Sequence, residues 1–462
     1  MFTDWIPNHK SLFACIPGKN GFLPKIQPLK KLPYQFNTIN SILDKMKISN
    51  PDSLIAEKTI KHTIENQLPL YNFEGQISTQ IIGALFRDYC FMASAYSLEP
   101  SHNDLKDGKY GKARTELPKN LAIPLLQLSE KLDVFPWLDY AYGYGLNNAV
   151  LKSPELDPGK YDSYETCRMF NGSSSESGFI NVHVAMVSYT GELLDIQQKI
   201  LKSASQNDYN DLAHFLNRHY SIMNKIIETL QTMWKASNKS DYLSFRTFIM
   251  GQKGNQEMYP DETIRFDLGD NVYKDFSFRG ETGAQDSIIP CVDNLFQVTY
   301  PQNKLTEYLY QLREYRPKDH QDYIEYNLKM SKTVGLIEKI FMDPNCSLAY
   351  YKNLNLIRIF RKKHWNLTKR YIIKNTDHPV ATGGTPITTW LPNQLGATME
   401  KMFLAQNHIE KMKSRLSDLD RETYTTIKLE LDEHRDSLFD EVHNLQPSFS
   451  KQEYGESCLK NN

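Results

Sequence analysis

Long stretches of helical periodicity are the feature of this sequence that most restricts its fold. Apolar residues recur at intervals of three and four over residues 80–96, 191–203, 207–235 and 305–315, which is the spacing of a helix that buries one face. Alternating strand-like runs joined by hairpin turns are scarce. The pattern therefore predicts an all-α fold. A chain of 462 residues is long enough for one large domain and a smaller one.

Polar and glycine-containing segments predict three regions. Residues 103–114 read as an exposed linker, which closes a smaller N-terminal helical domain, 1–115. Residues 116–397 carry further long helical periods and form the expected large domain. Residues 398–462 form a C-terminal helical extension, and we expect its polar end after Leu445 to fray.

The C-terminal extension carries a heptad-like seam of apolar residues spaced three and four apart. Its members are Met402, Ala405, Ile409, Met412, Leu416 and Leu419, followed by Tyr424, Ile427, Leu431 and Leu438. Such a seam fits either a helix pair that joins copies of the chain or an amphipathic helix that packs on its own domain. The first alternative predicts a homo-oligomer. In either case we expect the extension to be dispensable for chemistry.

Composition excludes several classes of function. Lys and Arg total 54 and Asp and Glu total 55, so the net charge of −1 offers no general attraction for nucleic acid or an anionic membrane. No stretch approaches the ~18 uninterrupted apolar residues of a membrane helix. The six cysteines lie too far apart for a zinc cage or a disulfide framework. We expect a cytoplasmic protein that binds neither nucleic acid nor membrane.

One histidine lies in the middle of an apolar helical face. On a helix over residues 356–373, His364 shares a face with Ile357, Phe360, Leu367 and Tyr371. Such an imidazole is either a core histidine satisfied by a hydrogen bond or the ligand of a cofactor metal. A haem iron needs one neutral imidazole on a rigid helix, with apolar walls and cations for its propionates.

Two glycine-bearing loops are further candidates for a binding site. Residues 278–287 place Gly280 and Gly283 in a turn, where glycine permits close approaches that side chains forbid. Residues 381–386 form a flexible, hydroxyl-rich loop that is able to close over a ligand. Each loop also has a plain explanation, the first as a helix cap and the second as a connector.

Taken together, these stretches resemble the indoleamine 2,3-dioxygenase family. The likeness runs in order through residues 116–132, 140–141, 246–255, 280–293, 315–320, 364–371 and 382–385. Residues before about 100 match weakly, and the chain beyond about 397 looks like an addition. The resemblance implies a two-domain, all-α fold that binds one haem b.

The resemblance also implies which residues hold the cofactor and the substrate. His364 corresponds to the proximal histidine, Arg361 and Asp293 to an ionic contact near the haem, and Gly280 to a turn beside the cofactor. Arg246 corresponds to the arginine that holds an amino-acid carboxylate, although a structural salt bridge would also explain it. Positions implied on the substrate side are Tyr140, Phe179, Tyr242, Thr282, Thr382 and Gly383.

Four positions depart from the family pattern. His183 stands where serine is frequent, and it is similar in role to the distal histidine that accepts the indole N–H in tryptophan 2,3-dioxygenases; a histidine turned into the core is the alternative. Asp241 replaces a pocket aromatic, and Glu281 and Ala381 replace glycines. The two carboxylates predict a changed preference among amine-bearing substrates.

The resemblance thus implies an oxidoreductase of tryptophan catabolism, the kynurenine pathway. The expected reaction inserts O2 across the indole C2–C3 bond of L-tryptophan or a related indoleamine and gives an N-formylkynurenine-type product. Two alternatives stay open: a haem enzyme of the same superfamily that oxidises or rearranges a modified indole or another aromatic amine, and a non-catalytic haem-binding sensor or scaffold. Arg246 and Thr382 speak against the sensor, which needs no carboxylate clamp.

Overall fold

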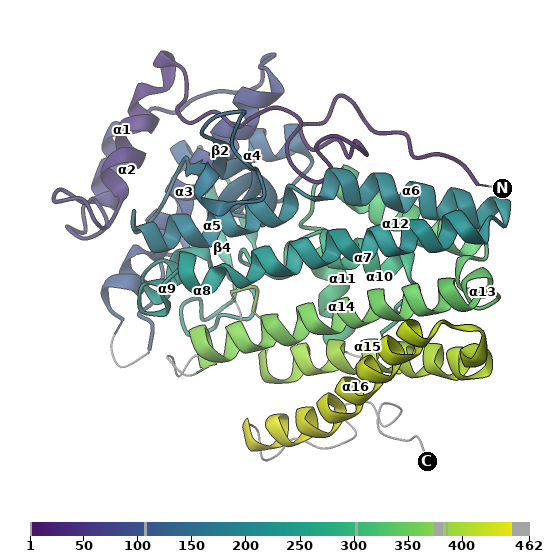
Figure 1. Ribbon diagram of the computed structural model, residues 1–462. Helices are drawn as coiled ribbons and strands as arrows, with labels where there is room; N and C mark the ends of the chain where they lie inside the picture. The colour runs from purple at the N-terminus through teal and green to yellow at the C-terminus, as the bar shows by residue number, and fades with distance from the viewer. Residues whose placement is uncertain (1, 106–108, 301–303, 374–381, 385–386, 446–462) are drawn as a thin grey trace.

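Helices dominate the chain, as the periodicity predicts (Figure 1). The computed structural model describes residues 2–105, 109–300, 304–373, 382–384 and 387–445. The fold is all-α, with short strands at its edges. Among the described residues, none of the helices combines the length and the apolar character needed to cross a membrane.

The N-terminal part is built around one central helix. Its elements are η1 (Tyr34–Phe36), α1 (Asn37–Met46), α2 (Ile60–Gln67), α3 (Thr79–Asn103) and α4 (Lys119–Leu132). Helix α3 contacts α1, α2 and α4, and every residue from Ile82 to Glu99 is buried. The helix is therefore enclosed on all sides, whereas its periodicity predicts only one buried face.

The segment predicted as an exposed linker, 103–114, is attached to the body of the protein. Tyr110 is buried, and its amide donates to the Glu257 carboxylate over 2.8 Å. The Arg114 guanidinium pairs with the Glu99 carboxylate at 2.5 Å. The prediction fails here because glycines and charged residues in a sequence indicate only a bend in the chain. Whether that bend is exposed depends on contacts with residues that are distant in the sequence. Residues 106–108 of this segment lie outside the described residues.

Four long helices form the layers that carry the site. Helices α6, α7, α14 and α15 contact one another in that order, and they lie nearly side by side in Figure 1. The elements from η2 to η5 are η2 (Tyr140–Tyr144), η3 (Leu146–Asn148), η4 (Tyr161–Ser163), α5 (Ser174–Val187), α6 (Thr190–Gln206), α7 (Tyr209–Gln231), α8 (Met233–Ala236), α9 (Lys239–Arg246) and η5 (Thr247–Ile249). Those that follow are η6 (Gly283–Gln285), α10 (Ile288–Leu295), α11 (Lys304–Arg313), α12 (Lys318–Thr333), α13 (Leu336–Ile340), α14 (Pro344–Thr368), η7 (Lys369–Ile373), α15 (Ile387–Met412), η8 (Lys413–Arg415) and α16 (Asp418–Leu445).

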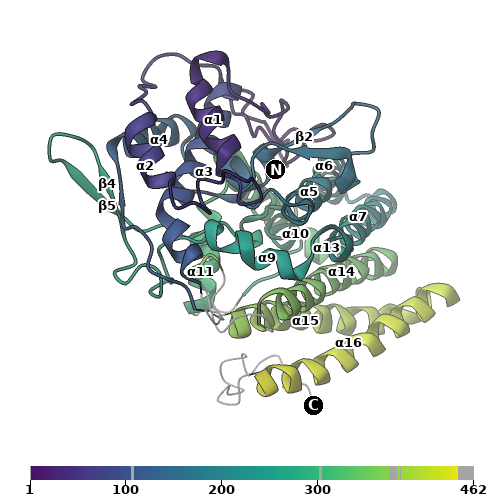
Figure 2. The ribbon, with the colours of Figure 1, turned by 90° about the vertical axis from the view of Figure 1, so that its left-hand side faces the viewer.

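Short strands join loops of the large part. Strand β1 (Glu116–Leu117) pairs in parallel with β4 (Ile264–Asp267), which pairs antiparallel with β5 (Tyr273–Phe276). Strands β2 (Ala149–Leu151) and β3 (Tyr164–Thr166) form a separate antiparallel pair. The hairpin of β4 and β5 projects from the body of the molecule (Figure 2).

The C-terminal seam packs inside the chain. Met402 and Ala405 of α15 and Tyr424 and Leu431 of α16 are fully buried, whereas Leu419 is 72% exposed. Helix α15 lies along α14, and α16 crosses beneath α15 (Figure 2). For these residues the structure bears out the second alternative, an amphipathic helix that packs on its own domain; a homo-oligomer stays a prediction. The expected boundary at 397/398 also falls within α15, while the division into domains stays a prediction.

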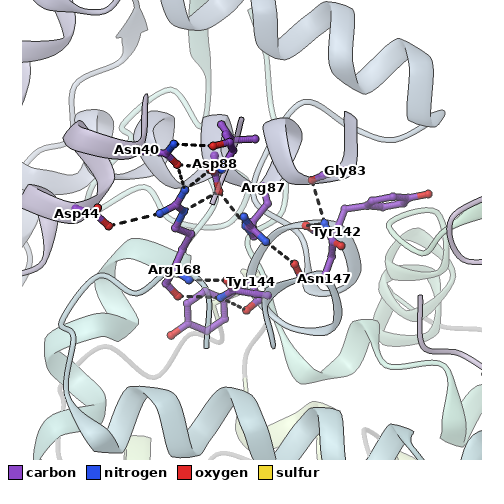
Figure 3. A network of polar contacts seen from close by, with 11 residues as sticks. Asn40, Asp44, Gly83, Arg87, Asp88, Tyr142, Tyr144, Asn147 and Arg168 are labelled. Atoms are coloured by element: carbon purple, nitrogen blue, oxygen red, sulfur yellow. Dashed lines mark hydrogen bonds and ion pairs between the residues drawn. The ribbon is translucent and has the colours of Figure 1, made fainter. Parts of the chain in front are cut away.

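A buried network of charges ties the N-terminal part to Asn147 and Arg168, which follow it in the chain (Figure 3). The carboxylate of Asp88 in α3 accepts hydrogen bonds from Arg87 Nε at 2.9 Å and from Arg168 Nε and Nη2 at 3.0 and 2.7 Å. Arg168 also donates to Asn40 of α1, and Arg87 donates to the Asn147 carbonyl. Asp88 and Arg87 are fully buried, so each charge depends on these partners.

Asp88→Ala is expected to destabilise the fold by about 3–5 kcal/mol, because it leaves the buried guanidinium of Arg87 without a carboxylate and that of Arg168 with only the more distant Asp44. Chemical denaturation of the purified protein measures this change. Asp44→Ala is the matched control: Asp44 meets Arg168 at 3.6 Å with a side chain 42% exposed, and such exposed pairs contribute about 0–1 kcal/mol. Equal effects of the two substitutions would contradict the role given to Asp88.

Candidate active site

Two adjoining cavities lie between α5, α7 and α14. The α9-side cavity, with its opening to solvent included, has a volume of about 850 Å³ and is bordered by Tyr242 of α9. The α10-side cavity, measured in the same way, has a volume of about 840 Å³ and is bordered by Asp293 of α10. Both cavities are lined by His183 of α5 and His364 of α14, as well as by Leu230 and Gly283. Two imidazoles from different helices thus border both cavities.

Helix α14 presents His364 to these cavities on the predicted apolar face. Ile357 of that face is fully buried, while Phe360, Leu367 and Tyr371 line the cavities on either side of His364. Burial lowers the pKa of His364 to about 4, so its imidazole is neutral near pH 7 and retains a nitrogen lone pair. Burial, with a smaller contribution from the neighbouring His364, likewise lowers the pKa of His183 to about 4.

Apolar side chains form most of the α9-side cavity, with few polar groups between them. Phe179, Met233, Ile249 and Leu367 contribute the apolar surface. The polar lining consists of Glu281, Thr282, Thr368 and Thr382, together with the two histidines and the tyrosines. Among the described residues, no Lys or Arg lines this cavity.

Charged groups border the α10-side cavity instead. Arg361 Nη2 and Asp293 Oδ2, the pair that the resemblance implies, lie 2.6 Å apart in a buried ion pair that also contacts Tyr300. Arg361 Nε and Asp293 Oδ1 are buried without a hydrogen-bond partner. Arg313 and Arg316 line the same cavity. The α10-side cavity therefore combines apolar walls with three guanidinium groups.

A polar chain of contacts reaches His183 from α10. Tyr140 Oη lies 3.3 Å from Asp286 Oδ2 and 3.5 Å from His183 Nδ1. Asp286 Oδ1 accepts from the amide of Ile288 at 2.8 Å, and burial raises the pKa of Asp286 to about 6. If Tyr140 donates to Asp286, its oxygen is able to accept from Nδ1 of His183, which leaves Nε2 as an acceptor.

Glycines let three loops meet backbone to backbone beside the α9-side cavity. A Cβ atom on Gly280 would lie 2.4 Å from both the Gly251 nitrogen and the Thr382 oxygen. Side chains are therefore excluded at this junction, which places Thr382 against the loop that carries Glu281 and Thr282. Of the loop 381–386, only residues 382–384 are described, so Ala381 lies outside the described residues.

The structure brings eight of the twelve predicted site residues to the cavity walls. They are Phe179, His183, Tyr242, Thr282, Asp293, Arg361, His364 and Thr382. The other four are buried next to the walls. Tyr140 contacts His183 as described, Gly280 forms the backbone junction, and the Gly383 carbonyl accepts from Arg279 at 2.9 Å.

Arg246 is fully buried behind the wall of the α9-side cavity. Its Nη1 donates to the hydroxyl of Tyr110 at 3.0 Å, and its charge acts on the buried phenol of Tyr242, whose ring lines the cavity. Asp241 faces away from the cavity, because its carboxylate accepts from Ser175 Oγ at 2.7 Å and borders a separate polar pocket. The expectation that Asp241 lies near the substrate is corrected.

Comparison with known proteins decides the family. The family model described as indoleamine 2,3-dioxygenase matches residues 14–420, which is most of the chain. The chain belongs to the indoleamine 2,3-dioxygenase family. The match includes nearly all of the N-terminal part and the whole of α15, so neither is an addition to the family fold.

The curated relatives have low sequence identity to this chain, but the similarity extends over most of each protein. An indoleamine 2,3-dioxygenase of Penicillium citrinum is 24% identical over 80% of this chain and 84% of its own length. The indoleamine 2,3-dioxygenase of Saccharomyces cerevisiae is 23% identical over 78% and 79%, and indoleamine 2,3-dioxygenase 1 of Rattus norvegicus is 24% identical over 63% and 74%. The chain is thus an oxidoreductase of the indoleamine 2,3-dioxygenase kind.

The residues of this indoleamine 2,3-dioxygenase family member fit the haem on which the family depends. Among the described residues, no cluster of three or more His, Cys, Asp or Glu is able to hold a bare metal ion, whereas a haem iron needs only one imidazole from the protein. His364 supplies a neutral one. The apolar walls suit a porphyrin, and the guanidinium groups of the α10-side cavity suit its propionates.

Sequence reasoning missed four residues of the site. Asp286, Tyr300, Arg313 and Arg316 line the α10-side cavity, but none was a candidate. Asp286 lies in the glycine-bearing turn 278–287, and Arg316 lies in the matching segment 315–320, so two of them stood within segments already singled out. Tyr300 and Arg313 carry no local signal, because their positions depend on how α10 and α11 pack.

Proposed function

We propose that this protein is a haem-dependent dioxygenase that inserts O2 across the indole C2–C3 bond of L-tryptophan or a related indoleamine, giving an N-formylkynurenine-type product. The observation that carries the proposal is the pair of neutral imidazoles, His183 and His364, which border both cavities from different helices in a chain of this family. His364 would hold a haem b, and His183 would be left to contact the substrate.

In this proposal the protein holds the cofactor through its own charges and walls. His364 would ligate the iron, and Arg361, Arg313 and Arg316 would face the propionates from the α10-side cavity. When bound, the haem supplies the activation of O2. Asp293 would keep Arg361 in place through the 2.6 Å ion pair.

The chain would orient the substrate and exclude water around it. Phe179 and Tyr242 offer ring surfaces to an indole in the α9-side cavity. His183 Nε2 would accept the indole N–H, with its tautomer set by Tyr140 and Asp286. Thr382, held against the loop of Thr282 by the glycine junction, would close the cavity over the substrate. Such positioning lowers the barrier by fixing the reactants in place.

The direct test is anaerobic reduction of the holoprotein, followed by addition of O2 and L-tryptophan or tryptamine. The expected result is a kynurenine-type chromophore from at least one substrate. Haem-loaded protein that forms no product from either indole would contradict the proposal.

Arg246→Ala is expected to lower kcat/KM for L-tryptophan roughly tenfold to several-hundredfold, because it would remove a charge-assisted contact to the substrate carboxylate, which contributes about 1.5–3 kcal/mol and more where a charge is left buried. Arg246 lies behind the wall, so this contact requires Tyr242 to move aside when the substrate binds. Tryptamine lacks the carboxylate and serves as the control substrate, for which the loss is small. Equal losses for both substrates, matched by Tyr110→Phe, would assign Arg246 a purely structural role.

His183→Ser is expected to reduce the discrimination between L-tryptophan and its N1-methyl derivative about fivefold to tenfold, as the loss of about 1 kcal/mol for one hydrogen bond requires. The ratio of the two kcat/KM values in each protein is the measurement. Tyr140→Phe is the matched control: it removes only the hydroxyl that orients His183, so a smaller change in the same direction is expected. Unchanged discrimination in His183→Ser would place the indole N–H elsewhere.

A second candidate substrate is a modified indole or another aromatic amine. The observation that favours it is Glu281, a carboxyl group in the wall of the α9-side cavity.

A further inference from the structure

Glu281 is an acid with no partner in the wall of the α9-side cavity. Its side chain is 2% exposed and borders the cavity. Among the described residues it makes no hydrogen bond and no ion pair, and it is the only carboxyl group that lines this cavity. A buried polar group is normally satisfied, so one that faces an empty space points to a ligand that satisfies it.

The surroundings of Glu281 favour the protonated form of its carboxyl group. The nearby carboxylate of Asp139 accepts backbone hydrogen bonds from Tyr142 at 2.7 Å and Gly143 at 2.9 Å, which favour its charged form. Burial raises the pKa of Glu281 to about 8, with the charge of Asp139 adding to the effect, whereas burial raises the pKa of Asp139 only to about 7. In the absence of a ligand, Glu281 therefore keeps its proton near pH 7.

The remaining titratable groups that line this cavity or interact with Glu281 supply no positive charge, and the guanidinium of Arg246 lies behind the wall, next to Tyr242. These groups are Tyr140, Tyr144 and Tyr242, which interact with Glu281 electrostatically, and His183, His364 and Tyr371, which line the same cavity. All six are neutral near pH 7, because burial raises the pKa of each tyrosine and lowers the pKa of each histidine. A cation bound in the cavity would therefore find its counter-charge at Glu281.

We infer that Glu281 is a specificity-determining residue of this chain: its carboxyl group binds the side-chain amine of the substrate, and discrimination between indoles with and without a basic amine depends on it. This inference rests on the proposed function. On binding, the carboxyl proton of Glu281 passes to solvent and the resulting carboxylate faces the ammonium group. No bond to carbon changes in this step, and the charges of acid and amine balance inside the cavity.

The test compares two indoles of similar size by isothermal titration calorimetry on the holoprotein. Tryptamine carries the ammonium group and 3-ethylindole does not. The wild-type protein is expected to bind tryptamine at least about tenfold more tightly, with net proton release seen as a dependence of the binding heat on the ionisation heat of the buffer. In Glu281→Gln both the preference and the proton release are expected to disappear.

Asp241→Asn is the matched control, because it removes one carboxylate from outside the cavity. It is expected to keep the tryptamine preference. Thermal unfolding without ligand gives a second readout: Glu281→Gln should be at least as stable as the wild type, since no contact is lost, whereas a structural acid would make it less stable. Glu281→Gly, which restores the residue frequent in the family, should behave like Glu281→Gln in binding.

The outcomes separate the two proposals. A tryptamine preference that survives in Glu281→Gln would assign the amine to another anion, such as a haem propionate, and would overturn the inference while the dioxygenase function stands. Equal binding of both indoles by the wild type would also overturn it. Failure of the holoprotein to bind or convert any indole would contradict the proposed function, and the inference with it.

Discussion

Replacing His364 by alanine is expected to abolish haem retention and, with it, turnover. His364 is the imidazole that the long helix α14 presents to both cavities, and burial keeps it neutral. Without it the porphyrin would be held by packing and propionate contacts alone. The absorption spectrum of the purified variant, read against the pyridine haemochrome content, measures the loss.

The control for this prediction is a substitution of the second histidine that lines both cavities. His183→Ala removes the other imidazole and is expected to retain haem with an imidazole-ligated spectrum. Imidazole added to His364→Gly should restore part of that spectrum by filling the space left by the side chain. If His364→Ala purifies with full haem and an unchanged Soret band, the assignment of His364 is wrong.

Truncation before Glu400 is expected to prevent folding of the large part of the chain. The deletion removes Met402, Ala405, Tyr424 and Leu431, which are fully buried, and uncovers the face of α14 beside the site. Burial of each large apolar side chain contributes about 1.5–3 kcal/mol, so Met402, Tyr424 and Leu431 alone account for roughly 5–9 kcal/mol, which is comparable with the ~5–15 kcal/mol by which a typical fold is stable. Soluble yield, helical circular dichroism and haem content measure the effect.

Single substitutions in the C-terminal helices test whether their buried side chains, and not only their length, stabilise the fold. Met402→Ala, at a fully buried position, is expected to cost about 2–5 kcal/mol, whereas Leu419→Ala, at a position 72% exposed, should change stability little. A truncated chain that still unfolds cooperatively and binds haem would show that the C-terminal helices are dispensable, as the sequence alone predicts.

The sequence predicted the elements whose pattern is local. Helical spacing located α3, α6, α7 and α14, and the apolar stripe around His364 identified the face that lines the cavities. The same spacing found the C-terminal seam but left its partner open. A 3-4 repeat records only that one face is apolar, and it carries no information on whether that face meets its own domain or another copy.

Residues whose positions depend on distant segments were harder to predict. Arg246 was placed in the substrate pocket through the resemblance, yet in the structure Tyr110 holds it behind the wall. Tyr110 belongs to a segment that looks like a linker, so no local pattern links the two. The role of Asp286 depends on Tyr140 and His183, which come from two other elements and join it in one chain of contacts in the structure.

The position of α15 has a consequence for the order in which the α10-side cavity forms. Gln394 of α15 lines this cavity, and Thr398 of the same helix accepts a hydrogen bond from Arg361, three residues before His364. During synthesis α14 leaves the ribosome before α15. The wall around His364 and Arg361 is therefore complete only after α15 has been made and has docked against α14.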